Sequence, residues 1–349
     1  MTNAPMNKAK AAKCDEFYTQ LDTVGDEMHA YADYNPELFK GKTVLLPCDD
    51  PEWSAFTSFF TQKFDELGLH KLISTSYSKT GKGKLFTLKR DRRRKQTRIA
   101  DLEWEWLEGN GDFRSAEVTA LRDQADFVIT NPPFSLFREF LAWCLEGGQA
   151  FSIIGNIDAI TNKDMFPLFQ REEIWLGATG NDKDMPFGVP ADQYVDPADA
   201  RKAAKMGFDA DYAKRVGFNG KYTRLGKTAW FTNIEYQRRH IPSEFSTEAE
   251  NRRWNSKVLN NSEAYCTYDN YDAIEVPYCR AIPSDFKGVM GVPKSFLNTF
   301  CPDQFEIVGI TENGEHSPVA HLRKPAGPRH DRPYIAGRRL QPRILIRHR

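Results

Sequence analysis

Short apolar runs alternate, along the first 240 residues, with longer segments in which apolar side chains recur every three or four positions. The runs predict buried strands, and the longer segments predict amphipathic helices. Strands are predicted at 43–47, 70–76, 126–130, 150–155, 173–177 and 228–234. Helices are predicted from Leu21 to near Asn35-Pro36, from Pro51 to just before Gly68, and at 135–146. This alternation is typical of a parallel, doubly wound α/β sheet.

The pattern also predicts how the chain is divided. Residues 1–14 are small and basic and are predicted to be flexible, whereas 15–240 form the α/β domain. A polar, weakly periodic stretch at about 178–227 interrupts that domain and is interpreted as an insertion. Beyond residue 240 the alternation fades, so 241–349 is predicted to be a second region with a different role.

Composition excludes several classes of protein. The 349 residues are 40% hydrophobic and 13% aromatic, enough apolar area to build a large core. We find no apolar run long enough to span a membrane and no signal peptide, which predicts a cytoplasmic protein. Six cysteines without a CxxC pair argue against a zinc ribbon or a disulfide framework. The histidines show no ligand spacing either, so no metal is predicted.

The formal net charge is zero, but the charged residues are unevenly distributed along the chain. Residues 82–98 contain nine Lys or Arg and one acid, Asp91, and follow glycines that predict a loop. Residues 201–227 contain eight Lys or Arg, and residues 323–349 contain nine. One such run is most often a solvated face, but three predict a polarised surface suited to nucleic acid. The densest run is predicted to contact DNA through Lys89, Arg90, Arg92, Arg93, Arg94 and Lys95.

The tetrapeptide Asn131-Pro132-Pro133-Phe134 directly follows the predicted strand 126–130. Ligands of doubly wound sheets bind at the carboxyl ends of strands, which is where this tetrapeptide lies. An exocyclic aromatic amine is a poor nucleophile because its lone pair is delocalised into the ring. The Asn131 oxygen and a proline-held carbonyl can each accept one amine hydrogen, which localises that lone pair. Phe134 can stack on an extruded base; the alternative is a turn in which it only packs.

This motif resembles the (D/N/S)PP(Y/F/W) signature of the amino-methyltransferases that use S-adenosylmethionine. Together with the segments 10–20, 44–51 and 290–293, it resembles the EcoRI-type DNA adenine methyltransferases over nearly the whole chain. The resemblance implies a Rossmann-like methyltransferase sheet in the catalytic domain 15–240 and a DNA-recognition region at 241–349. It implies that the catalytic residues are Asn131, Pro132, Pro133 and Phe134. It implies cofactor contacts from Phe17, Tyr18, Thr19, Pro47, Cys48, Asp49, Asp50, Asp112 and Phe113.

The chain departs from the usual cofactor pattern in two places. The loop Val44–Pro51 lacks the glycines normally found there, and no acidic residue near 74–79 is available for the cofactor ribose. Asp49 and Asp50 could instead cap the helix expected at Pro51. Gly111-Asp112-Phe113 could be a simple turn.

The sequence therefore predicts a site-specific enzyme that methylates the exocyclic amine of a flipped adenine in duplex DNA and acts as a monomer. Two alternatives stay open at this point. The same motif serves methyltransferases of RNA bases and of protein glutamine, and a decayed methyltransferase fold could bind DNA without catalysis. The GAATTC target of the resembled family is a hypothesis only.

Overall fold

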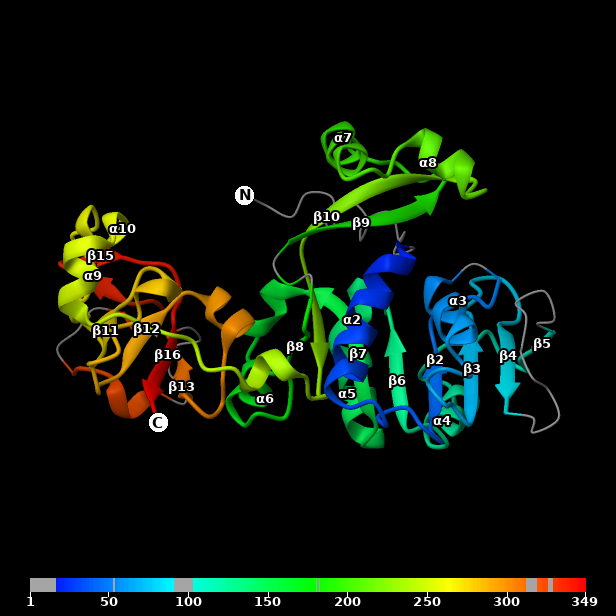
Figure 1. Ribbon diagram of the computed structural model, residues 1–349, viewed down its shortest axis with the longest axis horizontal. Helices are drawn as coiled ribbons and strands as arrows, with labels where there is room; N and C mark the ends of the chain where they lie inside the picture. The colour runs from blue at the N-terminus through cyan, green and yellow to red at the C-terminus, as the bar shows by residue number, and fades with distance from the viewer. Residues whose placement is uncertain are drawn as a thin grey trace. The chain divides into compact units, whose positions relative to one another are not determined.

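The computed structural model describes residues 17–52, 54–90, 103–179, 181, 183–311, 319–325 and 329–349 (Figure 1). The described chain divides into two compact units. The first comprises 17–157 and Leu176–Tyr236, and the second comprises Asp158–Trp175 and Gln237–Arg349. Residues 158–175 thus belong to the second unit, although the sequence pattern placed them in the α/β domain.

The first unit is built on a large mixed sheet. Its ten described strands follow the order β1-β9-β10-β7-β6-β2-β3-β4-β5, with β8 beside β10. The central strands β7, β6, β2 and β3 are parallel, as predicted, but β4, β5, β9 and β10 run antiparallel to their neighbours. The strands are β1 (Tyr18–Thr19), β2 (Thr43–Leu46), β3 (Lys71–Thr75), β4 (Lys84–Lys89), β5 (Trp104–Trp106), β6 (Phe127–Thr130), β7 (Ala150–Asn156), β8 (Trp175–Leu176), β9 (Lys183–Pro190) and β10 (Gly220–Thr232).

Helical spacing correctly predicts three of the six described helices of this unit, one with a shifted start, and misses the other three. In α2 the side chains of Val24, Met28 and Tyr31 are fully buried. The helix expected from Pro51 begins instead at Ala55, because the Ser54 hydroxyl accepts hydrogen bonds from the first backbone N–H groups. Its cap is therefore Ser54 and neither Asp49 nor Asp50. The helices are α2 (Leu21–Tyr34), α3 (Ala55–Gln62), α4 (Ala116–Arg122), α5 (Phe137–Gly147), α7 (Pro197–Lys205) and α8 (Ala210–Arg215).

Two stretches predicted to be irregular are regular. The basic run begins inside β4, which pairs along its length with β3, so the predicted loop is wrong up to Lys89. The insertion 178–227 contains β9, α7, α8 and the first half of β10, and Figure 1 shows this hairpin with its two helices beyond one edge of the sheet. Aromatic packing of Phe208, Tyr212 and Phe218 on Tyr222 gives it a small core.

The second unit has its own sheets and core. Four strands pair in the order β11-β12-β16-β13, and two more form the hairpin β14-β15. Arg343 and Glu275 form a buried ion pair at 2.6 Å on this sheet, and Tyr268 donates to the same carboxylate. No described helix of either unit combines the length and apolarity needed to cross a bilayer. The elements are α6 (Phe166–Gln170), α9 (Glu248–Trp254), α10 (Ser256–Leu259), β11 (Ile274–Glu275), β12 (Met290–Val292), β13 (Phe305–Ile310), β14 (Tyr334–Ile335), β15 (Arg338–Arg339) and β16 (Ile344–His348).

A buried carboxylate fastens α2 to the sheet. Glu27 is fully buried and accepts hydrogen bonds from the backbone N–H groups of Ala178 and Thr179, at 2.8 and 2.7 Å. It also accepts from the Tyr31 hydroxyl at 2.5 Å, and that hydroxyl lies 3.1 Å from Ser152 of β7. Since β1 directly precedes α2, this anchor also holds the segment that carries residues 17–19.

Replacing Glu27 with Ala should leave the backbone N–H groups of Ala178 and Thr179 without their acceptor and remove one partner of the buried Tyr31 hydroxyl. Unsatisfied buried groups of this kind cost about 1–3 kcal/mol each, so we expect a loss of roughly 3–5 kcal/mol in unfolding free energy. Urea denaturation followed by circular dichroism measures it. Glu37→Ala, at a carboxylate that is 68% exposed, is the matched control and should change stability little. Equal stability of the two variants would contradict the anchoring role.

Candidate functional site

Two loops meet at the point where the strand order of the central sheet reverses. From β2 the chain proceeds to β3 on one side, whereas β6 and β7 lie on the other side. The loops that follow β2 and β6 therefore leave the carboxyl ends of two adjacent parallel strands, the place where such sheets bind ligands. A cavity of about 970 Å³ lies there.

The structure brings most of the predicted site residues to this one cavity. Its lining includes Phe17, Tyr18, Thr19, Cys48, Asp49, Asp50, Asp112, Phe113, Asn131 and Pro133. Three predicted residues do not line it: Pro47, Pro132 and Phe134. The N-terminal motif reaches the cavity because β1 pairs antiparallel with β9 of the insertion. Segments separated by more than 110 residues thus share one wall.

Asn131 carries an unused acceptor in this wall. Its side-chain nitrogen donates to the backbone carbonyl of Phe17 at 2.7 Å. Its side-chain oxygen is buried and has no hydrogen-bond partner among the described residues. A buried acceptor without a partner is costly, so a donor from a ligand would be favourable at this point. The Thr19 hydroxyl, in the same lining, is likewise buried without a partner in the described chain.

Phe134 lies behind the cavity wall. Its ring meets those of Phe17 and Phe187 edge-on, with centroids 5.6 and 6.4 Å apart, and only 9% of the residue is exposed. In this arrangement Phe134 packs, and stacking on an extruded base stays a prediction. Phe187 comes from β9, so the insertion supports the motif directly.

Asp49 joins the two loops. It follows β2 and is only 6% exposed, with its two carboxyl oxygens accepting from Ser54 and Thr130 at 2.6 Å each. Thr130 is the last residue of β6 and immediately precedes Asn131. Burial raises the pKa of Asp49 to about 7. The position of Asn131 is thereby tied to the loop in which the cofactor residues were predicted.

The other acidic groups of the cavity pair with basic side chains, and its thiol is buried. Asp50 pairs with Lys84 at 3.0 Å, and Lys84 also contacts Glu52. Hydrogen bonds from Arg114, one of them at 2.7 Å, hold the pKa of Asp112 below its usual value. Burial raises the pKa of the Cys48 thiol well above its usual range, so this sulfur is no thiolate nucleophile.

Sequence reasoning missed several residues of the lining. Ser76, Tyr77 and Lys79 follow β3, at the place where an acidic residue was sought. Gly111 adopts a left-handed φ of 78°, and a Cβ there would lie 2.0 Å from the Ser76 carbonyl. The glycine at position 111 was the one feature of the sequence from which the contact between these two loops could have been inferred. The missed residues are Ser54, Ala55, Phe56, Ser76, Tyr77, Lys79, Gly111, Arg114, Ser135 and Leu136.

The predicted DNA-contacting run is only partly described. Lys89 ends β4, and Arg90 follows it with its guanidinium donating to the Leu69 carbonyl at 2.8 Å. Both residues are exposed. Arg92, Arg93, Arg94 and Lys95 lie outside the described residues, so their role stays a prediction.

Comparison with known proteins identifies the family. Residues 5–349 match the family described as adenine-specific methyltransferase EcoRI. The chain is 35% identical over 316 residues to the type II methyltransferase M.EcoRI of Escherichia coli, covering 88% of this chain and 89% of that protein. It is 35% identical over 308 residues to M.MpnI of Mycoplasma pneumoniae, covering 88% and 86%. This chain belongs to the EcoRI family of adenine-specific methyltransferases.

Membership of the EcoRI family confirms the predicted function at the level of the family: an adenine-specific type II DNA methyltransferase. A third relative, M.MgeORF184P of Mycoplasma genitalium, is 34% identical over 309 residues and covers 88% of this chain. The identities extend over both units. The alternative of a protein or RNA methyltransferase is therefore not retained.

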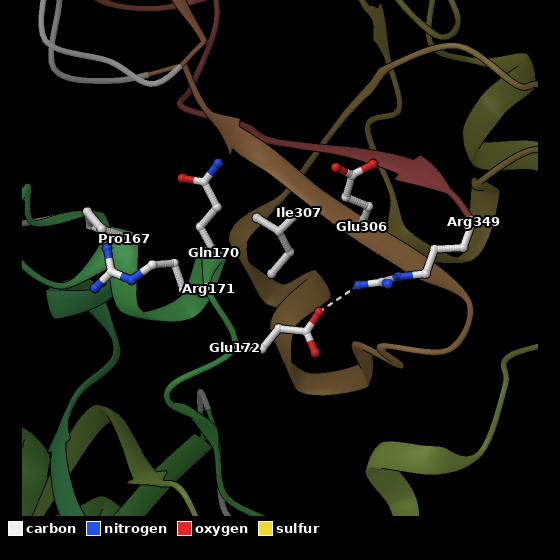
Figure 2. Close-up of a pocket in the computed structure, with 7 residues that line it drawn as sticks. All are labelled: Pro167, Gln170, Arg171, Glu172, Glu306, Ile307 and Arg349. Carbon is white, nitrogen blue, oxygen red and sulfur yellow. Dashed lines mark hydrogen bonds and ion pairs between the residues drawn. The ribbon is translucent and has the colours of Figure 1, made fainter.

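A second cavity of this EcoRI-family methyltransferase, of about 640 Å³, lies within the second unit (Figure 2). The charged side chains that line this cavity form ion pairs with other residues of the protein. Glu172 pairs with Arg349 at 2.7 Å, as the dashed line in Figure 2 shows, and also with Arg239. Glu306 pairs with Arg347 at 2.7 Å. None of the described side chains that line it has a buried polar atom without a partner, in contrast to Asn131 in the first cavity.

Asp49→Asn keeps the shape of the side chain and removes its titration. Because the pKa of Asp49 is raised from 3.8 to about 7, the folded protein binds more protons at this group than the unfolded chain between those values. The free energy of unfolding should therefore fall as the pH rises through this window, and fall less in the variant. Urea unfolding at several pH values between about 4 and 8 measures the difference. Asp65→Asn, at an exposed carboxylate, is the control. Identical pH profiles of wild type and Asp49→Asn would contradict the burial argument.

Proposed function

We propose that this enzyme transfers the methyl group of S-adenosylmethionine to the exocyclic N6 amine of an adenine that has been flipped out of duplex DNA. The observation that carries the proposal is the unpartnered side-chain oxygen of Asn131 in the wall of the cavity. An adenine amine offers hydrogen-bond donors, which is what this acceptor lacks.

Asn131 would act on the amine without being a strong base. Its nitrogen is fixed by the Phe17 carbonyl, so its oxygen is the atom free to accept an amine hydrogen. Accepting that hydrogen localises the nitrogen lone pair, and the interaction strengthens as positive charge develops on nitrogen in the transition state. Pro132 and Pro133 restrict φ and hold the adjoining backbone carbonyl as a second acceptor. The amine thus becomes nucleophilic at neutral pH.

The rest of the cavity suits the cofactor. S-adenosylmethionine supplies an electrophilic methyl group on a positively charged sulfur. The carboxylates of Asp49 and Asp50 and the orphaned hydroxyl of Thr19 are suited to its cationic methionine part. Asp112 is suited to accept from its adenine amine, and Arg114 keeps that carboxylate ionised. We assign the further contacts predicted from the sequence to Phe17, Tyr18, Cys48 and Phe113, which line the cavity, and not to Pro47, which does not.

The two units are suited to different roles in the reaction. We assign methyl transfer to the first unit because it contains the cavity, and recognition of the DNA sequence to 241–349 within the second. The basic segments would contact phosphates, which position a protein on DNA without reading bases. Action as a monomer stays a prediction.

Asn131→Ala removes the acceptor and should reduce turnover by on the order of 10² or more, because the lost interaction acts mainly in the transition state. Affinity for S-adenosylmethionine should barely change. Single-turnover methylation of duplex DNA, with calorimetric titration of the cofactor, separates the two effects. Asn131→Asp restores an acceptor oxygen and should retain more activity than the alanine variant. Near-normal turnover of Asn131→Ala on saturating DNA would overturn this role.

Asp112→Ala tests the cofactor assignment without DNA. A buried amine donor left without its acceptor costs about 1–3 kcal/mol, so S-adenosylmethionine should bind correspondingly more weakly. Calorimetry on a variant shown to be folded by circular dichroism is the measurement. Asp65→Ala, whose carboxylate is exposed and lies outside the cavity lining, should leave the affinity unchanged. Unchanged affinity of Asp112→Ala would return residues 111–113 to the role of a simple turn.

A further inference from the structure

An exposed tryptophan stands out in the second unit. Trp254, the last residue of α9, is 71% exposed, the highest value among the large apolar side chains that the structure describes. The Arg253 guanidinium lies over its ring, 4.5 Å from the centroid. A tryptophan with so much apolar area in water contributes little to the core and is accessible to a binding partner.

The local sequence holds this side chain in a rigid turn. Thr247 and Glu250 form a capping box that begins α9. Asn255 ends α9 and at the same time caps α10, with its side-chain oxygen accepting from the Lys257 N–H at 3.2 Å. One residue therefore joins the two helices, and the turn between them presents Trp254.

A second pair of a cation and an aromatic ring adjoins the first. The Lys257 ammonium lies over the Tyr278 ring at 5.4 Å, and Tyr278 is 37% exposed. Neither Arg253 nor Lys257 pairs with a carboxylate of the described chain. Arg338 of β15, which Figure 1 shows near α9 and α10, already pairs with Glu263 at 2.9 Å and is not counted with these two cations.

We propose that the surface formed by Arg253, Trp254, Lys257 and Tyr278, here called the α9–α10 surface, contacts the DNA duplex. The proposal rests on the DNA substrate of the proposed function and names where the second unit touches it. Unpaired cations attract phosphates, and each phosphate contact releases condensed counterions. A flat, exposed aromatic ring can pack on sugar or on the edge of a base step.

The chemistry favours DNA over a protein partner. Tryptophan and arginine are enriched at protein interfaces too, but lysine is depleted there, and here both Arg253 and Lys257 lack carboxylate partners in the described chain. Acidic side chains nearby are already engaged: Glu248 pairs with Arg252 at 2.8 Å, and Glu250 serves the capping box. The segment that carries Trp254 thus supplies two cations, Arg253 and Lys257, that lack carboxylate partners in the described chain.

The test uses the full-length enzyme and a fluorescein-labelled, mixed-sequence DNA duplex. Fluorescence anisotropy at several salt concentrations gives the affinity and its salt dependence for three proteins: Trp254→Ala, the double variant Arg253→Gln/Lys257→Gln, and wild type. Arg171→Gln/Lys40→Gln, which removes two exposed cations that already have carboxylate partners, is the matched control.

We expect the double variant to lower affinity and to make the slope of log affinity against log salt shallower by up to about 2 units. Trp254→Ala should weaken binding at least about fivefold with an unchanged slope, because it removes no charge. The control should match wild type. Trp254→Phe provides a second measurement: the change in tryptophan fluorescence when DNA is added should be smaller than in wild type.

Affinity and slope equal to those of wild type in both α9–α10 variants, with an unaltered fluorescence change in Trp254→Phe, would overturn the inference while leaving the proposed function intact. Failure of the wild-type enzyme itself to bind or methylate duplex DNA would instead overturn the proposed function, and this inference with it. S-adenosylmethionine affinity, measured in parallel, should be the same in all variants, since the altered residues lie outside the cavity.

Discussion

The buried carboxyl group of Asp49 is the constraint on which the site depends. It joins three elements by hydrogen bonds: the loop after β2 that carries it, the start of α3 through Ser54, and the end of β6 through Thr130. Asn131 follows Thr130, and its nitrogen reaches across to the Phe17 carbonyl. With its nitrogen used in this way and its backbone held on both sides, the side chain of Asn131 is left with one unsatisfied oxygen. The catalytic proposal thus rests on a chain of short contacts rather than on one motif.

The cavity forms without a glycine-rich loop after β2. Glycines allow close approach of the backbone to a ligand, and this chain has none between Val44 and Pro51. A glycine that permits close backbone approach lies elsewhere, at Gly111, where the loop after β3 and the loop of Asp112 touch. The insertion contributes as well, because β9 pairs with β1 and supplies Phe187 to the aromatic cluster beneath the motif. The cavity is therefore assembled from distant segments of the first unit.

Much of this could be predicted from the sequence, but only where the signal is local. The apolar runs at 43–47 and 126–130 and the prolines after Asn131 predicted two parallel strands and the loops at their ends, and the structure places both there. The pairing of β1 with β9 involves residues about 170 positions apart, and no local sequence pattern indicates it. β4 was missed because its lysines at both ends made the run look like a solvated loop. Lining residues such as Ser76 and Tyr77 are ordinary in type, so only the fold reveals them.

The central claim is that the side-chain oxygen of Asn131 accepts a hydrogen from the target amine. A crystal structure of the full-length enzyme with duplex DNA and S-adenosylhomocysteine, the demethylated product of the cofactor, measures this most directly. The account predicts an adenine outside the helical stack, with its N6 amine within hydrogen-bond distance of the Asn131 oxygen, while the Asn131 nitrogen still donates to Phe17. An adenine amine directed at another acceptor, with the Asn131 oxygen bonded to the protein or left empty, would contradict it.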